Sequence, residues 1–242
     1  MIQSGDTVTR RESLRQSFAA AYPIMLGYVA IGIPCGILCD SIGLNALQVL
    51  LLSALFYSGA GQFMIPNLYL ASTPVVSIIA SVSLVNTRQM LYSASFAPEC
   101  GGASKLLAFF FTATVTDESY GVNIAKFKTG DWSVGRALGV NLMSQSSWAI
   151  SNVIGVLVGS LIDIPLPIAS FAMTSIFICL LFTQKLTSEN IIAAVMAIVG
   201  VAVCKILGLS SAAILIGAVV GVVCAMVFSS IKRRLIGKGD RL

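Results

Sequence analysis

Eight apolar segments, separated by Gly, Pro, Asn, Asp or charged residues, constrain this chain more than any other feature of its sequence. A run of about 20 apolar residues is long enough to cross a bilayer as a helix. Helices satisfy their own backbone hydrogen bonds in lipid, which open strands do not. The sequence therefore predicts an all-α fold, a polytopic transmembrane helical bundle, with spans at 18–39, 45–70, 74–97, 104–125, 135–160, 165–184, 189–207 and 211–230.

The composition of the chain supports a membrane protein. Hydrophobic residues make up 57% of the 242 positions and charged residues 10%, whereas a soluble domain carries about 25% charged residues. The net charge of +5 is interpreted as an excess of lysine and arginine at the cytoplasmic ends of the helices, where these residues contact anionic lipid. No soluble basic domain with interspersed aromatic residues is present, so nucleic acid is not an expected partner.

The lysine and arginine residues determine the predicted topology, because they concentrate on the cytoplasmic side of a membrane. Eight spans place the basic amino end, the loop AKFKTGDWSVGR and the tail IKRRLIGKGDRL on that side. Seven spans would leave one basic end outside, and Lys105 and Lys205 remain as outer exceptions. The predicted organisation is a cytoplasmic segment at 1–17, a transmembrane domain at 18–230 and a basic cytoplasmic tail at 231–242.

The inventory of reactive residues argues against an enzyme, a metal site or a cofactor. The chain contains six cysteines and no histidine, so Cys35 and Cys39, four residues apart, have too few companion ligands for a metal. A Ser–His pair is excluded, and one adjacent Asp–Glu pair does not form a facing carboxylate dyad. No phosphate-binding glycine loop occurs either.

An arginine interrupts the third span, in the stretch VNTRQMLY. Arg88 lies roughly nine residues from the outer end of the span, where a buried arginine costs at least about 2.5 kcal/mol. The stretch TDESYG in the fourth span places Asp117 at a comparable depth if the two spans form an antiparallel hairpin. Glu118 projects about 100° from Asp117, so the two carboxylates cannot both face one partner, and one of them is free to take a proton or meet a substrate ammonium. The alternative is a salt bridge that only holds the hairpin together.

The second span contains the stretch YSGAGQF, in which Gly59 and Gly61 weaken the helix beside the amide of Gln62. Broken helices present free backbone groups to substrates at mid-depth, although small residues also serve close helix packing. Phe56, Phe63, Met64 and Met90 are candidates for an apolar pocket. In the fifth span Asn141, Gln145 and Trp148 share one helix face, where they line a cavity or hydrogen-bond across a helix interface.

A short internal similarity joins GIPCGILCD, in the first span, to GVLVGSLID, in the fifth. Four intervening spans would make the two copies run in the same direction, as in transporters with parallel repeats. The match is short and lies in apolar sequence, so chance similarity is the alternative.

The three stretches YSGAGQF, VNTRQMLY and TDESYG, in this order, resemble signatures of the AzlC family, the larger subunit of bacterial branched-chain amino acid exporters. The resemblance covers roughly residues 15 to 230 and implies a multi-pass protein of the bacterial inner (cytoplasmic) membrane with a small AzlD-type membrane subunit as partner. Family members often carry histidine after the arginine, where this chain has Gln89. The implied substrate-binding residues are Gly59, Gly61, Gln62, Asn86 and Arg88, and the implied proton-coupling or ion-pair residues are Asp117 and Glu118.

The expected function is a secondary transporter that exports branched-chain amino acids, with methionine as a further candidate, coupled to protons. The substrate carboxylate would meet Arg88 and its ammonium would meet Asp117 or Glu118. Two alternatives stay open at this point. One is a passive channel lined by the same polar residues. The other is a structural subunit whose polar motifs bind its partner.

Overall fold

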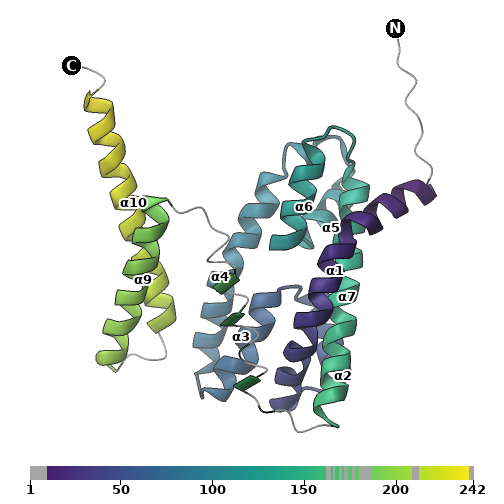
Figure 1. Ribbon diagram of the computed structural model, residues 1–242, viewed down its shortest axis with the longest axis horizontal. Coiled ribbons are helices and arrows are strands. Elements are labelled where there is room, and N and C mark those ends of the chain that lie inside the picture. The colour runs from purple at the N-terminus through teal and green to yellow at the C-terminus, as the bar shows by residue number, and fades with distance from the viewer. Residues whose placement is uncertain are drawn as a thin grey trace. The chain divides into compact units, whose positions relative to one another are not determined.

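The computed structural model describes residues 10–161, 187–208 and 213–239, together with scattered positions between 165 and 179. These residues form helices and no strand, which confirms the all-α prediction for them. Most of the predicted span at 165–184, and Lys185 after it, lie outside the described residues. The helices are α1 (Arg10–Ser41), α2 (Ala46–Leu55), α3 (Gly59–Leu70), α4 (Val75–Ser95), η1 (Glu99–Gly102), α5 (Lys105–Ala113), α6 (Asp117–Phe127), α7 (Val134–Gly159), α9 (Ser188–Ile206) and α10 (Ala213–Gly239) (Figure 1).

The chain divides into two compact units. The first comprises Met1–Asn67 and Val85–Met173, and the second comprises Leu68–Leu84 and Thr174–Leu242. In the second unit α9 packs against α10 through small residues, and Lys232 forms an ion pair of 2.8 Å with Glu189. Helix α10 continues through residues that the sequence predicts as a tail.

The parallel helices α1 and α7 form the spine of the first unit, where they lie side by side (Figure 1). The hydroxyls of Ser147 and Ser151 in α7 donate to backbone carbonyls of α1, at Met25 and Tyr28. The glycines of the two similar stretches face each other across this interface, since a Cβ atom at Gly36 would lie 2.8 Å from Cα of Gly155. Close packing of two small-residue motifs therefore accounts for the internal similarity.

The predicted span at 45–70 is broken at residues 56–58. Helix α2 ends at Leu55, and Ser58 caps the new helix α3 by accepting from the N–H of Gly61. The side chain of Gln62 reaches back to Ser53 and to the carbonyl of Phe56, so α3 folds back along α2. The expected weak point is confirmed, but the segment is a helical hairpin with its tip at residues 56–58.

The predicted span at 104–125 is also a helical hairpin, with its tip at residues 114–116. Thr116 caps the start of α6 and forms a capping box with Ser119, so a new helix begins directly after the end of α5. One apolar cluster contacts the chain on both sides of this hairpin. Its buried members are Phe96, Phe111, Val115, Val134 and Ala137. Residues before the hairpin (Cys100 and Ala103) and residues at or after its end (Phe127 and Trp132) both pack against it. Both ends of the segment therefore lie against the same cluster, and residues 104–125 form two short helices in place of one continuous helix.

Two described helices, α1 and α9, are long and apolar enough to cross a membrane on length and composition alone. Large apolar side chains on both helices are exposed, including Tyr22 and Leu26 on α1 and Ile198 on α9. Helices α4 and α7 are 21 and 26 residues long, which also matches the thickness of a bilayer of about 30 Å. Both helices also carry polar residues, among them Asn86 and Arg88 on α4 and Asn141 and Gln145 on α7.

Candidate functional site

The tips of the two hairpins meet beside Tyr28, in the middle of α1. The Tyr28 hydroxyl lies 2.9 Å from Oγ1 of Thr116 and donates to Oε2 of Glu118 at 2.7 Å. Its ring packs edge-on against Tyr57, from the tip of the first hairpin, with the ring centroids 6.3 Å apart. A tyrosine of α1 therefore bridges the two points at which the helices break.

Helix α4 runs past both tips and contacts each of them through polar side chains, including that of Gln89, which donates to the carbonyl of Tyr57. Nη2 of Arg88 forms an ion pair of 2.8 Å with Oδ2 of Asp117, the first residue of α6. Two residues earlier on α4, Asn86 accepts at its Oδ1 from the hydroxyl of Ser58 at 2.6 Å. The Arg88 and Asp117 side chains keep 28% and 17% of their exposure, so the pair remains accessible from one side.

Helix α7 supplies side-chain amides that satisfy the carbonyls left free where α2 and α5 end. The amide of Gln145 donates to the carbonyls of Ser53 and Ala54, and the amide of Asn141 donates to the carbonyl of Phe111. The sequence left two roles open for these amides. The structure confirms hydrogen bonding across a helix interface, because both amides bind backbone of neighbouring helices.

Gln62 holds the first hairpin closed from within the protein interior. Its amide donates to the carbonyl of Phe56 at 2.7 Å, and its oxygen accepts from Nε1 of Trp148 at 2.7 Å. The side chain is completely buried, and the ring of Trp148 covers Gly59. Gln62, Gly59 and Gly61 therefore shape the tip of the hairpin, and the side chain of Trp148 occupies the space beside Gly59.

Two buried polar atoms near the meeting point have no hydrogen-bond partner among the described residues. They are the hydroxyl of Tyr57 and Nε of Arg88. Buried polar groups are nearly always hydrogen-bonded in native structures. Both groups therefore keep hydrogen-bonding capacity beside the tips that the described residues do not use.

The sequence pointed to most of this site and missed three of its residues. The structure brings Asn86, Arg88, Asp117 and Glu118 together around the tips, whereas Tyr28, Tyr57 and Thr116 were not anticipated. Two sequence features could have indicated them: Tyr28 is a tyrosine in the middle of a predicted span, and Thr116 directly precedes Asp117 and Glu118. Of the apolar candidates, Phe63 and Met64 are buried, but Met90 is 72% exposed and does not line the site.

Replacing Gln62 with Leu is expected to destabilise the protein by about 2–4 kcal/mol. The change removes the buried acceptor of the Trp148 N–H and of the Ser53 hydroxyl, at about 1–3 kcal/mol for each unsatisfied group. Thermal unfolding in detergent measures the loss, with Gln16→Leu as the control, because Gln16 makes only a 3.5 Å contact to Glu12. An equal midpoint for both variants would contradict the role of Gln62.

The fold and the site define a helical membrane protein with a polar centre where two helical hairpins meet. The chain matches the AzlC protein family over residues 23–162, more than half of its length, and it belongs to that family. No solved structure matches the chain.

Individual relatives share about a quarter of the sequence. A Helicobacter pylori protein described as a membrane protein is 28% identical, over 90% of this chain and 95% of the relative. The Bacillus subtilis branched-chain amino acid transport protein AzlC is 24% identical, over 74% of this chain and 70% of the relative. The Escherichia coli inner membrane protein YgaZ is 26% identical, over 57% of this chain and 58% of the relative. Of these three names, that of the Bacillus subtilis relative states an activity, the transport of branched-chain amino acids.

Proposed function

We propose that this chain is a secondary transporter that exports branched-chain amino acids and holds its substrate between the tips of the two hairpins. One observation carries the proposal: the Arg88–Asp117 ion pair lies beside both helix breaks, with Nε of Arg88 buried and unpartnered. In transporters, substrates bind near the midplane at helix breaks of this kind. The Bacillus subtilis relative is named for the same class of substrate.

The proposed binding mode uses both ends of a zwitterionic amino acid. The substrate carboxylate meets Arg88 and the free hydroxyl of Tyr57, and the ammonium meets Asp117 or Glu118. Asn86 holds the first tip through Ser58, and Gln62, Gly59 and Gly61 give that tip its shape. Leucine, isoleucine and valine, with methionine as a further candidate, present an aliphatic side chain to the apolar residues around the tips.

Glu118 is the proposed proton carrier. Asp117 is held by a cation, whereas the partner of Glu118 is the neutral hydroxyl of Tyr28. A carboxylate without a cationic partner exchanges a proton at a lower electrostatic cost. This assignment replaces the histidine that family members often carry, since the chain has none.

Replacing Glu118 with Gln is expected to uncouple transport from the pH gradient while substrate still binds. The amide keeps the hydrogen bond to Tyr28 and carries no exchangeable charge. Gradient-driven leucine efflux from proteoliposomes should fall to background, and leucine–leucine exchange without a gradient should persist. Efflux by the variant that still follows the gradient would contradict the assignment.

The hairpins give a proposed topology of six crossings and two re-entrant hairpins, in place of eight crossings. The crossings among the described helices are α1, α4, α7, α9 and α10. The span that the sequence predicts at 165–184 is kept as the sixth, so both termini still lie in the cytoplasm. Helix α1 with the first hairpin, and α4 with the second, form two similar groups that run in opposite directions, the arrangement of an inverted repeat. The charges support this topology, because Lys105 becomes cytoplasmic instead of an outer exception.

Labelling of cysteine tests the topology. We expect native Cys100 to be labelled from the same side of the membrane as Thr129→Cys and from the opposite side to Gly43→Cys, with the other five cysteines replaced. Eight crossings would place Cys100 and residue 129 on opposite sides. Burial, followed by the charge of Glu99, raises the pKa of the Cys100 thiol, so labelling is expected to accelerate at a higher pH than it does for an ordinary exposed thiol.

Reconstitution tests the function itself. The chain is placed in proteoliposomes alone or with a small AzlD-type membrane subunit, and leucine efflux is followed across an imposed pH gradient. Efflux that needs the gradient supports a secondary transporter, and a requirement for the subunit supports the two-subunit exporter. Efflux that ignores the gradient would indicate a channel. Absence of leucine flux in both arrangements would contradict the substrate.

A further inference from the structure

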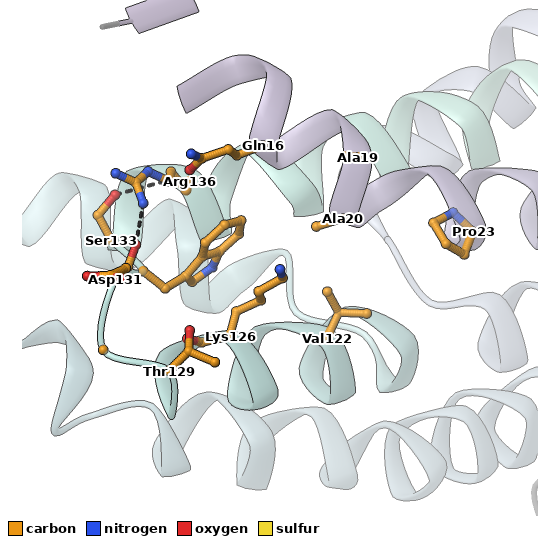
Figure 2. A pocket seen from close by; sticks show the side chains of 12 residues that line it. Gln16, Ala19, Ala20, Pro23, Val122, Lys126, Thr129, Asp131, Ser133 and Arg136 are labelled. Atoms are coloured by element: carbon orange, nitrogen blue, oxygen red, sulfur yellow. Dashed lines mark hydrogen bonds between the residues drawn. The ribbon is translucent and has the colours of Figure 1, made fainter. Parts of the chain in front are cut away.

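An open cavity of about 1060 Å³ lies at the amino end of the first unit, away from the hairpin tips. It is bounded by the early turns of α1, the end of α6, the loop at 128–133 and the start of α7 (Figure 2). The proposed transport site does not include any of its lining residues. The cavity therefore calls for a separate explanation.

Two cations converge on an indole ring in this cavity. Nζ of Lys126 lies 5.6 Å from the ring centroid of Trp132, and the guanidinium of Arg136 lies 5.9 Å from it (Figure 2). Asp131 is the acidic residue of the described lining, and Arg136 donates to its backbone carbonyl. Among the described residues, no carboxylate forms an ion pair with Lys126 or Arg136. The cavity thus holds two positive charges that the protein does not neutralise.

The opposite wall of the cavity is apolar. Ala19, Ala20 and Pro23 of α1 line it, together with Val122 of α6 (Figure 2). On α1 this level lies just beyond Arg15 and beside the exposed aromatic rings of Phe18 and Tyr22. Basic residues followed by exposed aromatic rings mark the boundary between cytoplasm and hydrocarbon.

We propose that this cavity binds an anionic glycerophospholipid of the surrounding bilayer. The headgroup phosphate lies between Lys126 and Arg136, within reach of the Thr129 hydroxyl, and an acyl chain follows the apolar wall formed by α1. Charge complementarity favours the phosphate, because basic pockets between membrane helices bind anionic headgroups. The apolar wall favours a lipid over free phosphate, because inorganic phosphate has no apolar group that could contact this wall.

The experiment uses the full chain in nanodiscs of phosphatidylcholine, with phosphatidylglycerol added as the probe and bound lipid counted by native mass spectrometry. Lys126→Gln and Arg136→Gln are each expected to weaken phosphatidylglycerol binding about tenfold, because each removes a charge-assisted hydrogen bond to the headgroup phosphate. The matched control is Lys128→Gln, which removes the same charge two residues away and outside the lining. The control should bind like the wild type.

Three results would overturn the proposal. Equal losses in Lys128→Gln and Lys126→Gln would indicate a general attraction of the cytoplasmic lysine and arginine residues for anionic lipid. Equal binding of phosphatidylcholine would remove the role of the headgroup charge. Displacement of the lipid by millimolar inorganic phosphate would identify a site for the free anion. The thermal unfolding midpoint of each variant is first measured in phosphatidylcholine alone. Equal midpoints show that every variant is folded before the numbers of bound lipids are compared.

Discussion

Replacing Arg88 with Ala is expected to lower leucine transport more than about a hundredfold. The change leaves Asp117 without its partner at 2.8 Å and removes the proposed contact to the substrate carboxylate. Removing one member of a fully buried ion pair costs about 3–5 kcal/mol, and this partly exposed pair is expected to lie at the lower end of that range. Since 1.4 kcal/mol corresponds to about tenfold in an equilibrium, the loss should be nearly complete. Leucine efflux from proteoliposomes, normalised to the amount of inserted protein, measures it.

A double variant separates a binding role of the pair from a purely structural one. Arg88→Gln with Asp117→Asn removes both charges together, so no unpaired charge remains beside the helix breaks. If the ion pair only holds α4 against α6, the double variant should recover most of the transport that Arg88→Ala loses. If Arg88 binds the substrate, the double variant stays inactive while its thermal midpoint recovers. Recovered transport would therefore contradict the site.

The second unit offers a matched control for this experiment. Lys232 and Glu189 form an ion pair of the same length, 2.8 Å, between α10 and α9. Lys232→Gln is expected to leave transport within about twofold of the wild type, because exposed ion pairs contribute about 0–1 kcal/mol. A large loss in this variant would show that transport responds to any broken ion pair.

The sequence predicted the polar centre better than the path of the chain around it. Arg88 and Asp117 were identifiable because charges in apolar helices are rare and need partners. The reversal at residues 114–116 was not readable, because two short apolar helices have the same periodicity whether the chain continues or turns back. Only contacts distant in sequence, such as Cys100 and Phe127 against one cluster, distinguish the two paths.

Local signals for the two helix breaks were nevertheless present in the sequence. Ser58 and Thr116 each stand directly before a new helix and cap it with their hydroxyl. Serine and threonine are favoured at such positions because they accept from free N–H groups at the start of a helix. A cap residue within an apolar run is therefore a readable sign of a new helix, although it does not reveal the direction in which that helix leaves.

Replacing Gly36 with Ala is expected to destabilise the first unit by about 3 kcal/mol or more. A Cβ atom at Gly36 would lie 2.0 Å from the carbonyl oxygen of Asn152, a backbone atom that no rotamer change can move. The helices α1 and α7 would have to separate, which also disturbs the hydrogen bonds from Ser147 and Ser151 to α1. Overpacking costs about 1–3 kcal/mol and more where the backbone cannot adjust.

Gly27→Ala is the matched control on the same helix, because a Cβ atom there meets nothing within 4 Å. Alanine is favoured over glycine in a helix by about 1 kcal/mol, so this variant should unfold at the same temperature as the wild type or higher. Gly36→Ala should lower the midpoint by about 6–12 °C, at about 2–4 °C per kcal/mol for a chain of this size. Equal midpoints for the two variants would mean that α1 and α7 are not in close contact. The hairpin tips would then not be held in position by this helix pair.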